Sequence, residues 1–312
     1  MALAQTEEIV RQLAALDGGV AGEIVRFTPS GDRDVVSKLD RHGGKGGAFV
    51  GEIRDAMRDG ALEAAMHSLK DVPGDEETPG LVLGAYLKRE AVEDALVLRP
   101  DQSLEAFERD GGAGRRIGTN SVRRAAFLKR LYPAADVIHF RGAADTRLRK
   151  LDNQEPQKLP DGGATDPADA LVMAASGLNR IGFGDRIAKT FDIEDMLPAV
   201  GQGIVVVECA ANDWATQAHL AKIDNPQSRA RALAERELLW VLNGHCNSPI
   251  AGHATIDGDA MTLRACVLSL DGEKVIEETQ TADAARPREL GRAVALALLG
   301  RGADALIEAA RP

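Results

Sequence analysis

Short apolar runs alternate with amphipathic stretches along the chain up to about residue 210. The apolar runs predict strands at 23–27, 62–69, 81–87, 94–100, 137–140, 169–175 and 203–209. Between several of them, the stretches 49–60, 121–133 and 145–152 repeat apolar residues at helical spacing. This alternation predicts an α/β fold with doubly wound, mostly parallel sheets, in two lobes between which the chain crosses near residues 90 and 202.

The pattern changes near residue 226, where a helical stretch at 228–244 precedes three segments of alternating apolar and polar residues. These segments, at 250–257, 261–270 and 274–281, are separated by "DGD" and "DGE". Such turn signals predict an antiparallel meander. A helical stretch at 287–310 follows, so the C-terminal part is expected to be a small α+β domain.

Composition narrows the class of protein. With 44% hydrophobic and 28% charged residues the chain is expected to be globular. The stretch 1–19 lacks the features of a signal peptide and predicts instead an amphipathic helix that begins almost at residue 1. No apolar run approaches the roughly 18 residues of a membrane span. Three cysteines without a CxxC pair argue against a disulfide framework or a zinc site and favour a reducing cytoplasm.

The net charge of −10 disfavours nucleic acid as a partner, but the charge is unevenly distributed. Between Arg115 and Lys150 there are ten Lys or Arg and two acids, a local balance of +8, so the remainder carries −18. This basic segment predicts either a focused site for a polyanion or a solvated basic face. Ordinary salt bridges are expected of Arg115, Arg116, Arg130 and Arg149.

Three junctions share one design, in which a strand or a glycine-rich turn leads to a helix that begins with cations. They contain Lys45, then Thr119, Ser121, Arg123 and Arg124, and then Arg141, Gly142 and Arg147. Helix N-termini receive anions, and an arginine there is unfavourable for the helix unless an anion offsets it. Because ligands bind at the carboxyl ends of strands in doubly wound sheets, we expect an anion site here.

The stretch "HSLKDVP" places Lys70 and Asp71 together at the end of an apolar run, before Pro73. A solvated turn explains it, and so does a catalytic carboxylate beside a cation that binds an anionic substrate. Cys246 lies in the loop "LNGHCNSPIAGHA", where a cysteine is either incidental or functional, whereas Cys209 and Cys266 lie in apolar runs and are expected in the core.

Together these motifs resemble the hydroxymethylbilane synthase family, also called porphobilinogen deaminase. The matching stretches follow the family's order over nearly the whole chain: "GGKGGAFVGEI", "HSLKDVP", "IGTNSVRRAA", "FRGAADTRLRKLD", "AASGLNRIG", "LPAVGQGIVVVEC" and "AERELLWVLNGHCNSPI". The resemblance implies a transferase that joins four porphobilinogen units head to tail, releases ammonia and frees hydroxymethylbilane by hydrolysis.

The resemblance also implies a role for each matching residue. Cys246 takes the place of the cysteine that holds dipyrromethane through a thioether, and Asp71 that of the catalytic carboxylate. The other expected cofactor-binding residues are Lys70, Thr119, Ser121, Arg123, Arg124, Arg141 and Gly142, with Asp71 among them. Substrate binding is expected of Lys45, Ser68, Arg147 and Arg180. No metal is expected.

The family fold implies two lobes like those of periplasmic binding proteins and a third domain that carries the cysteine. The expected limits are 1–88 with 203–222 for lobe 1, 89–202 for lobe 2 and 226–312 for the C-terminal domain. A monomer in the cytoplasm is expected, with no nucleic-acid or membrane partner.

Three departures from the family pattern stand out. The family's first strand and its "IRIGTRGSPLALAQ"-like turn are absent before "MALAQ", so we expect lower stability and activity than for a chain that includes them. The family's "GGC" is "GHC" here, with His245 beside Cys246. The Pro-, Gly- and Asp-rich stretch 153–168 predicts an exposed, mobile insertion in lobe 2.

Two other classes of protein remain alternatives. A two-lobed solute-binding protein accounts for the lobes and the anion site, but normally has an export signal and leaves Asp71 and Cys246 without a role. A nucleic-acid-binding protein would use the basic segment, yet the acidic remainder and 4% aromatic residues argue against it.

Overall fold

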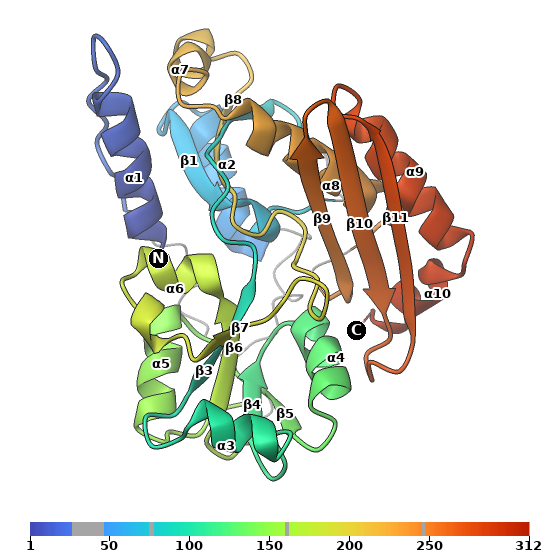
Figure 1. Ribbon diagram of the computed structural model, residues 1–312. Helices are drawn as coiled ribbons and strands as arrows, with labels where there is room; N and C mark the ends of the chain where they lie inside the picture. The colour runs from blue at the N-terminus through green and yellow to red at the C-terminus, as the bar shows by residue number, and fades with distance from the viewer. Residues whose placement is uncertain (27–46, 75–77, 160–161, 245–246, 312) are drawn as a thin grey trace.

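The computed structural model describes residues 1–26, 47–74, 78–159, 162–244 and 247–311, whose arrangement is shown in Figure 1. These residues form three sheets, two in the region of alternating strands and helices and one in the C-terminal meander. The expected α/β fold with an added α+β domain is therefore confirmed. The expectation that the first two sheets are mostly parallel is wrong for the described residues, because most of their strand pairings are antiparallel. The numerical domain limits stay a prediction.

The first sheet has the order β1-β8-β2, with strands Ala64–Ser68, Val205–Ala210 and Leu81–Tyr86. The helices α1 (Ala2–Ala14), α2 (Gly47–Arg58) and α7 (Trp214–Leu220) pack against it. β8 runs antiparallel to both neighbours, so the described part of this sheet has no parallel pair. The reason is topological, because β8 returns from the second lobe and enters between the two earlier strands.

The N-terminal region is partly as predicted. The amphipathic helix at 1–19 is confirmed, since α1 buries Ile9 against β2 and β8. The strand predicted at 23–27 is wrong, because residues 23–26 belong to no strand. Val25 is 57% exposed. An apolar run forms a strand only where a neighbour pairs its backbone and a core buries its side chains.

The second sheet has the order β5-β4-β6-β3-β7. Its strands are Asp136–His139, Arg116–Thr119, Ala170–Ala174, Asp94–Leu98 and Lys189–Thr190, and its helices are α3 (Leu104–Arg109), α4 (Val122–Leu131), α5 (Ala144–Asp152) and α6 (Ala175–Arg180). β4 is parallel to β5 and β6, whereas β3 is antiparallel to β6 and β7. β3 and β6 are buried throughout, which explains their continuous apolar sequences. β7 was not predicted because two residues show no period.

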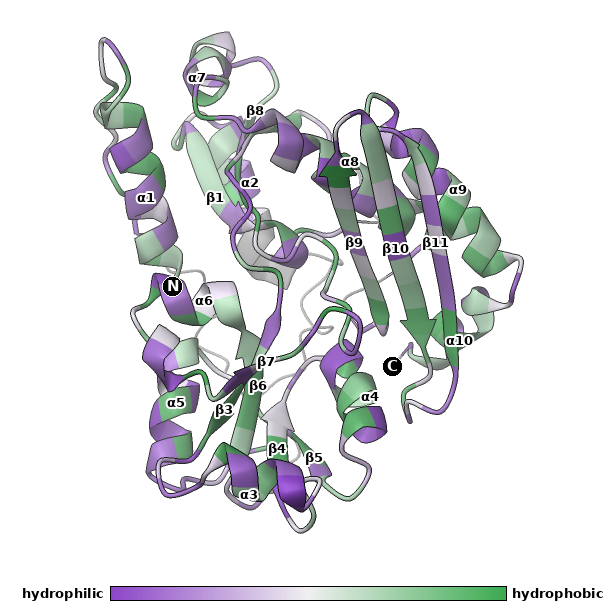
Figure 2. Cartoon of the chain, viewed as in Figure 1, coloured by the Kyte–Doolittle hydropathy of each residue, from purple (hydrophilic) through white to green (hydrophobic). Residues whose placement is uncertain are grey.

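The predicted meander is confirmed as β9 (Ile250–Asp257), β10 (Ala260–Leu268) and β11 (Val275–Asp283), with both pairings antiparallel. The helices α8 (Pro226–Leu242), α9 (Pro287–Leu299) and α10 (Ala303–Ala309) complete the domain. In Figure 2 the central strand β10 is largely apolar and the edge strand β11 largely hydrophilic, which matches their burial.

The C-terminal domain packs against the second sheet through a shared apolar core. Phe127 of α4 and Cys266 of β10 belong to one buried cluster. Polar contacts add to it, since Arg130 Nη1 at the end of α4 donates to the Gly272 carbonyl oxygen at 2.7 Å. Helix α4 is therefore held by both domains.

The two segments that cross between the lobes are bound by one carboxylate, Glu235 of α8. Arg89 Nη1 and Nη2 of the first crossing donate to its oxygens at 2.5 and 3.2 Å. Gly201 N of the second crossing donates at 2.7 Å, and Ala254 N of β9 donates at 2.8 Å. Glu235 is fully buried, so its charge depends on these donors, and His253 Nδ1 of β9 lies 3.9 Å from Oε1 as well.

The stretch 153–168, described except for 160–161, is only partly exposed, since Gln157 and Ala168 within it are buried. Leu159 N donates to the Gly163 carbonyl oxygen, and Thr165 N to that of Gln157, each at 2.8 Å. The described part therefore folds back on itself. Its mobility stays a prediction.

Replacing Arg89 with Met should destabilise the protein by about 3–5 kcal/mol, because Glu235 then remains buried without its cation. Urea unfolding followed by circular dichroism measures the free energy of unfolding. The matched control is Arg301→Met, which removes an exposed pair with Glu278 (3.5 Å) and should cost at most about 1 kcal/mol. Equal losses in the two variants would contradict the importance assigned to Glu235.

Candidate active site

Turns at the carboxyl ends of β1, β4 and β5 carry most of the side chains expected at the site. β1 continues into the short 3-10 helix η3 (Leu69–Asp71), β4 leads into α4, and β5 leads into α5. The charges of both Arg124 and Asp71 act on the pKa values of Lys70 and Arg147. The structure therefore brings these four side chains from three turns close together.

Helix η3 has a buried base and an exposed tip. Leu69 is 2% exposed, and its N–H donates to a carbonyl of the second crossing at 2.9 Å. Asp71 is exposed, although Val72 after it is buried. Burial, followed by the charge of Arg124, lowers the pKa of Lys70 to about 8. Lys70 is therefore a cation that mildly alkaline pH neutralises.

Arg123 and Arg124 in the first turn of α4 share one carboxylate, that of Asp94 at the start of β3. Arg123 Nη2 donates to Asp94 Oδ2 at 2.6 Å, and Arg124 Nε donates to Oδ1 at 2.9 Å. Gln202 Nε2 also donates to Oδ1 at 2.9 Å. Burial by itself raises the pKa of Asp94, but the two guanidinium charges and the hydrogen bonds outweigh it and hold this pKa well below its usual range.

Thr119 and Ser121 shape the turn that holds these arginines. Thr119 Oγ1 accepts a hydrogen bond from Ser121 N at 3.2 Å. Ser121 is the N-cap of α4, and its hydroxyl accepts from Arg124 N at 3.4 Å. Contact of either hydroxyl with a cofactor stays a prediction.

The turn between β5 and α5 presents cations without partners. Gly142 has φ +127°, a conformation that favours glycine. Burial, followed by the charge of Arg124, lowers the pKa of Arg147 to about 10, so it is still a cation at neutral pH. Within the described residues, the side chains of Arg141 and Arg147 make no hydrogen bond or ion pair, and Arg147 Nε is buried without a partner.

Ser68 and Arg180 both contact α1. Gln5 Nε2 donates to Ser68 Oγ at 3.2 Å. Arg180 Nη2 donates to the Gly203 carbonyl oxygen at 3.3 Å, and Arg180 Nε lies 3.9 Å from Glu8 Oε2. Helix α1 is thereby tied to both lobes, and binding of substrate by Ser68 or Arg180 stays a prediction.

Two of the expected residues, Lys45 and Cys246, lie outside the described residues. Helix α8 ends at Leu242, shortly before Cys246, and its C-cap Asn243 adopts the left-handed conformation with φ 51°. Gly244 N donates back to the Leu239 carbonyl oxygen at 3.1 Å. The helix end that leads to the cysteine is therefore closely capped.

The other two cysteines are core residues, as predicted. Cys209 and Cys266 are almost fully buried. Burial raises their pKa values to about 11 and about 12, respectively. Both thiols are therefore neutral and unreactive at physiological pH.

Some cations of the basic segment 115–150 form ion pairs with described carboxylates, and others do not. Arg116 and Arg149 form partly exposed ion pairs, as expected. The expected salt bridges of Arg115 and Arg130 are wrong, since neither pairs with a carboxylate among the described residues; Arg130 donates to backbone instead. Two cations of this segment without an ion pair among the described residues, Arg141 and Arg147, lie in the turn after β5 and in the first turn of α5.

Sequence reasoning missed Asp94 and Gln202, which position the paired arginines. Both are fully buried. One signal was available in "EDALVL", because an acid at the start of a wholly apolar strand needs a counter-charge. Gln202 gave no such signal, since its role depends on the second crossing passing beside β3.

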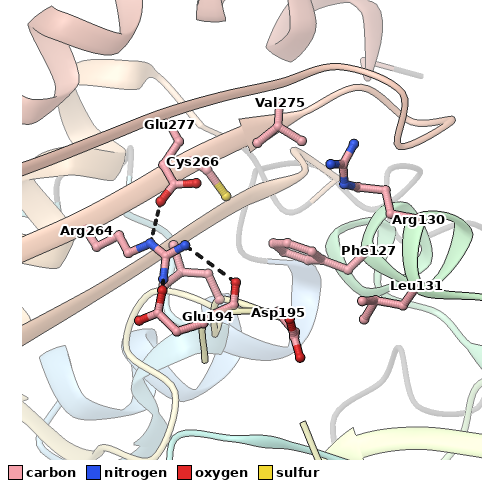
Figure 3. Close-up of a pocket in the computed structure, with 10 residues that line it drawn as sticks. Phe127, Arg130, Leu131, Glu194, Asp195, Arg264, Cys266, Val275 and Glu277 are labelled. Atoms are coloured by element: carbon pink, nitrogen blue, oxygen red, sulfur yellow. Dashed lines mark hydrogen bonds and ion pairs between the residues drawn. The ribbon is translucent and has the colours of Figure 1, made fainter. Parts of the chain in front are cut away.

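A separate pocket of about 270 Å³ lies between α4 and the C-terminal sheet (Figure 3). Phe127 forms part of its wall, and Arg264 binds both Glu194 and Glu277 at its rim. The pocket includes none of the expected site residues.

Neither a membrane span nor a metal centre is found in the part of the chain that the structure describes. No helix there is long and apolar enough to cross a bilayer. No group of three or more His, Cys, Asp or Glu side chains there is arranged to hold a metal ion.

What the site offers is an exposed carboxylate beside several cations, suited to an anionic substrate that develops positive charge.

Comparisons with known proteins cover almost the whole chain. The model "Porphobilinogen deaminase, dipyromethane cofactor binding domain" matches residues 1–218, and "Porphobilinogen deaminase, C-terminal domain" matches residues 229–300. Porphobilinogen deaminase 2 of Streptomyces coelicolor is 41% identical, over 99% of this chain and 93% of its own length. Porphobilinogen deaminase of Acidithiobacillus ferrooxidans is 39% identical, over 100% of this chain and 95% of its own.

Among solved structures, the periplasmic domain of BvgS from B. pertussis matches with a TM-score of 0.35 and 19% sequence identity. The match covers 69% of this chain and 34% of that one.

Asp94→Asn should lower the free energy of unfolding by about 3–5 kcal/mol at pH 7, because two buried arginines lose their counter-charge. The depressed pKa means that Asp94 contributes stability above its unfolded pKa of about 4, and that this contribution is lost as pH falls through the folded value. Urea unfolding between pH 7 and pH 3 should therefore show a smaller loss for the variant than for the wild type.

The matched control is Asp152→Asn, which removes a more exposed partner of Arg186. It should cost at most about 1 kcal/mol. An Asp94→Asn protein as stable as this control, or with the pH dependence of the wild type, would contradict the assignment.

Proposed function

Because this chain belongs to the porphobilinogen deaminase family, we propose that Asp71 is its catalytic carboxylate and that Cys246 carries its dipyrromethane cofactor. The reaction, hydroxymethylbilane synthesis, joins four porphobilinogen molecules head to tail, releases ammonia and frees the linear product by hydrolysis. It belongs to tetrapyrrole biosynthesis.

The observation that carries the assignment of site residues is a set of cations without protein partners. Lys70, Arg141 and Arg147 make no ion pair with any described carboxylate, although burial lowers the pKa of both Lys70 and Arg147. Desolvated cations are unfavourable unless a ligand supplies negative charge. Each pyrrole of the substrate and of the cofactor carries an acetate and a propionate, so both groups fit this donor set.

The paired arginines are proposed to bind cofactor carboxylates with a geometry that Asp94 maintains. Arg123 is fixed at one end by Asp94 and at the other by the Leu197 carbonyl oxygen, 2.7 Å from Nη1. Arg124 is closer to the cations of the other turns, since its charge lowers the pKa of both Lys70 and Arg147. One internal carboxylate against two guanidinium groups leaves a net positive charge for the ligand.

Asp71 is proposed to act on the reacting pyrroles. Its carboxylate can accept a hydrogen bond from a pyrrole N–H and stabilise the positive charge that develops as the amine leaves porphobilinogen. It can also assist the proton transfers that complete each condensation. Lys70 beside it would bind a substrate carboxylate, which accounts for the adjacent opposite charges in "HSLKDVP".

Cys246 is proposed to anchor the cofactor through a thioether. When bound, the dipyrromethane supplies the pyrrole α-carbon on which the product is built. His245 replaces a family glycine beside it and adds a titratable group without removing the thiol. Thr119, Ser121 and Gly142 would line the cofactor site, and Lys45, Ser68 and Arg180 would extend the substrate site.

A cytoplasmic monomer is the setting we propose for this activity. The sequence favours a reducing compartment, because its cysteines form no disulfide framework pattern. Porphobilinogen is the proposed partner, with neither nucleic acid nor membrane required.

Cys246→Ser should lose the covalent cofactor and the activity together. The intact mass of the denatured wild type should exceed that of the sequence by two linked pyrrole units, and the variant should show no adduct. If the wild type is unmodified, incubation with porphobilinogen should load it. Failure to load and to consume porphobilinogen would contradict the proposal, and Cys209→Ser should leave the adduct in place because that thiol is buried.

Lys70 should make kcat/KM fall as pH rises through about 8, because the ammonium is the form that binds a carboxylate and its pKa is about 8. Lys70→Arg should remove this fall, since a guanidinium stays charged. Initial rates between pH 7 and pH 9.5 test it. Lys189→Arg, at a surface pair with Glu108, is the control and should keep the wild-type profile. An unchanged profile in Lys70→Arg would show that another group titrates.

A further inference from the structure

The backbone that follows Asp71 is held by an arginine from a different domain. Arg236 of α8 donates from Nη1 to the Val72 carbonyl oxygen at 3.2 Å and from Nη2 to that of Pro73 at 2.9 Å. Val72 and Pro73 are the two residues directly after Asp71 and are both buried. A guanidinium presents its donors in a rigid fork, so two successive carbonyls are fixed by one side chain.

Two apolar contacts from α8 also hold the backbone that follows Asp71. Ala232 shares a buried cluster with Val72. Leu239 packs on Gly74 so closely that a Cβ there would lie 2.8 Å from Leu239 Cβ. Positions 232, 236 and 239 are four and three residues apart, which places them on one face of α8. A single helix face therefore holds three consecutive residues after Asp71.

The other side of η3 is confined as well. A Cβ on Gly201 would lie 2.8 Å from Leu69 Cγ, so the second crossing packs directly on the residue that begins η3. Val72 N also donates to the Leu69 carbonyl oxygen at 3.1 Å. The backbone on both sides of Asp71 is thus immobilised, while the Asp71 carboxylate is exposed.

Helix α8 also leads to the cysteine. It runs on from Arg236 to Leu242, about 9 Å at the usual rise per residue, and Cys246 follows its capped end. We infer that Arg236 is a positioning residue, which fixes the Asp71 carboxylate relative to the cofactor loop; this inference rests on the proposed roles of Asp71 and Cys246.

Arg236 has no carboxylate partner among the described residues that would explain it as half of a salt bridge. Its side-chain hydrogen bonds go to the two carbonyl oxygens. Arg229, two turns earlier on α8, provides a matched comparison. Its Nη2 donates to the Gly84 carbonyl oxygen of β2 at 2.9 Å, so it also joins α8 to the first sheet, but away from Asp71. Unlike Arg236, it also has a described carboxylate partner, since its Nε donates to Asp224 Oδ2 at 2.8 Å.

The experiment compares Arg236→Gln with Arg229→Gln in the cofactor-loaded enzyme. We expect Arg236→Gln to lower kcat about tenfold, because misplacing a catalytic group by a fraction of an ångström costs rate, and to change KM less than about twofold. Arg229→Gln should keep kcat within about twofold of the wild type. Intact mass should show the pyrrole adduct in both, so a lost cofactor is not the cause.

Single-turnover mass spectra measure how fast the first pyrrole unit is added, and loss of stability alone does not change this rate. With one equivalent of porphobilinogen, Arg236→Gln should be slow to add the first pyrrole unit, as Asp71→Asn is, whereas Arg229→Gln should add it at the wild-type rate. Arg236→Lys retains charge without the fork and should give an intermediate kcat even if the Gln variant folds poorly.

The two variants distinguish failure of the role proposed for Asp71 from failure of the role inferred for Arg236. If Asp71→Asn turns over like the wild type, the proposed role of Asp71 fails and the inference fails with it. If Asp71→Asn is inactive but Arg236→Gln matches Arg229→Gln in kcat and in the first addition, Arg236 is structural only and the inference alone is overturned.

Discussion

The Glu235 carboxylate accepts hydrogen bonds from both crossings and from the first strand of the C-terminal sheet, with no water-exposed surface of its own. A buried charge of this kind is tolerated only where every donor is in place. Both crossings and the C-terminal sheet therefore supply donors to one buried negative charge. The same crossings join the sheet whose strand end carries Lys70 to the sheet whose strand ends carry Arg124 and Arg147.

Asp94 is a second buried carboxylate whose charge requires fixed donors. Its partners are the two arginines that are proposed to bind the cofactor. It holds two guanidinium groups at the start of α4, where the end of β4 delivers them. Asp94 balances only part of their charge. The remaining positive charge, with that of the cations of the β1 and β5 turns that have no described partner, is available to the proposed polycarboxylate ligand. The charges of the two arginines would therefore affect both the stability of the fold and the affinity for the proposed ligand.

Local patterns predicted most of the elements and the junctions of the site. The apolar runs of β3 and β6, the meander and the basic helix starts follow from burial, turn chemistry and charge within a few residues of each other. What the patterns did not give depends on contacts distant in sequence. Val25 has the composition of a strand residue but no neighbour to pair with, and β8 runs antiparallel because of where it returns. Asp94 and Gln202 matter only because two crossings pass side by side.

The family resemblance assigned roles to single residues that charge and spacing left open. For Cys246 the residues around it favoured a loop, and only the match of "AERELLWVLNGHCNSPI" assigned it a cofactor. The role inferred for Arg236 arises differently, since nothing in that stretch indicates that its side chain reaches the backbone beside Asp71. This contact is visible only in the folded chain, where α8 packs beside η3.

The described part of 153–168 carries exposed positions such as Asn153 and Lys158, and it folds back on itself at the end of α5 far from the turn that carries Arg147. Exposed backbone with internal hydrogen bonds tolerates chemical additions with little effect on the core. It is therefore a suitable attachment point for a fluorophore or a spin label. A probe there would test whether lobe 2 moves as the product grows, and it would lie away from the turns that carry the proposed site residues.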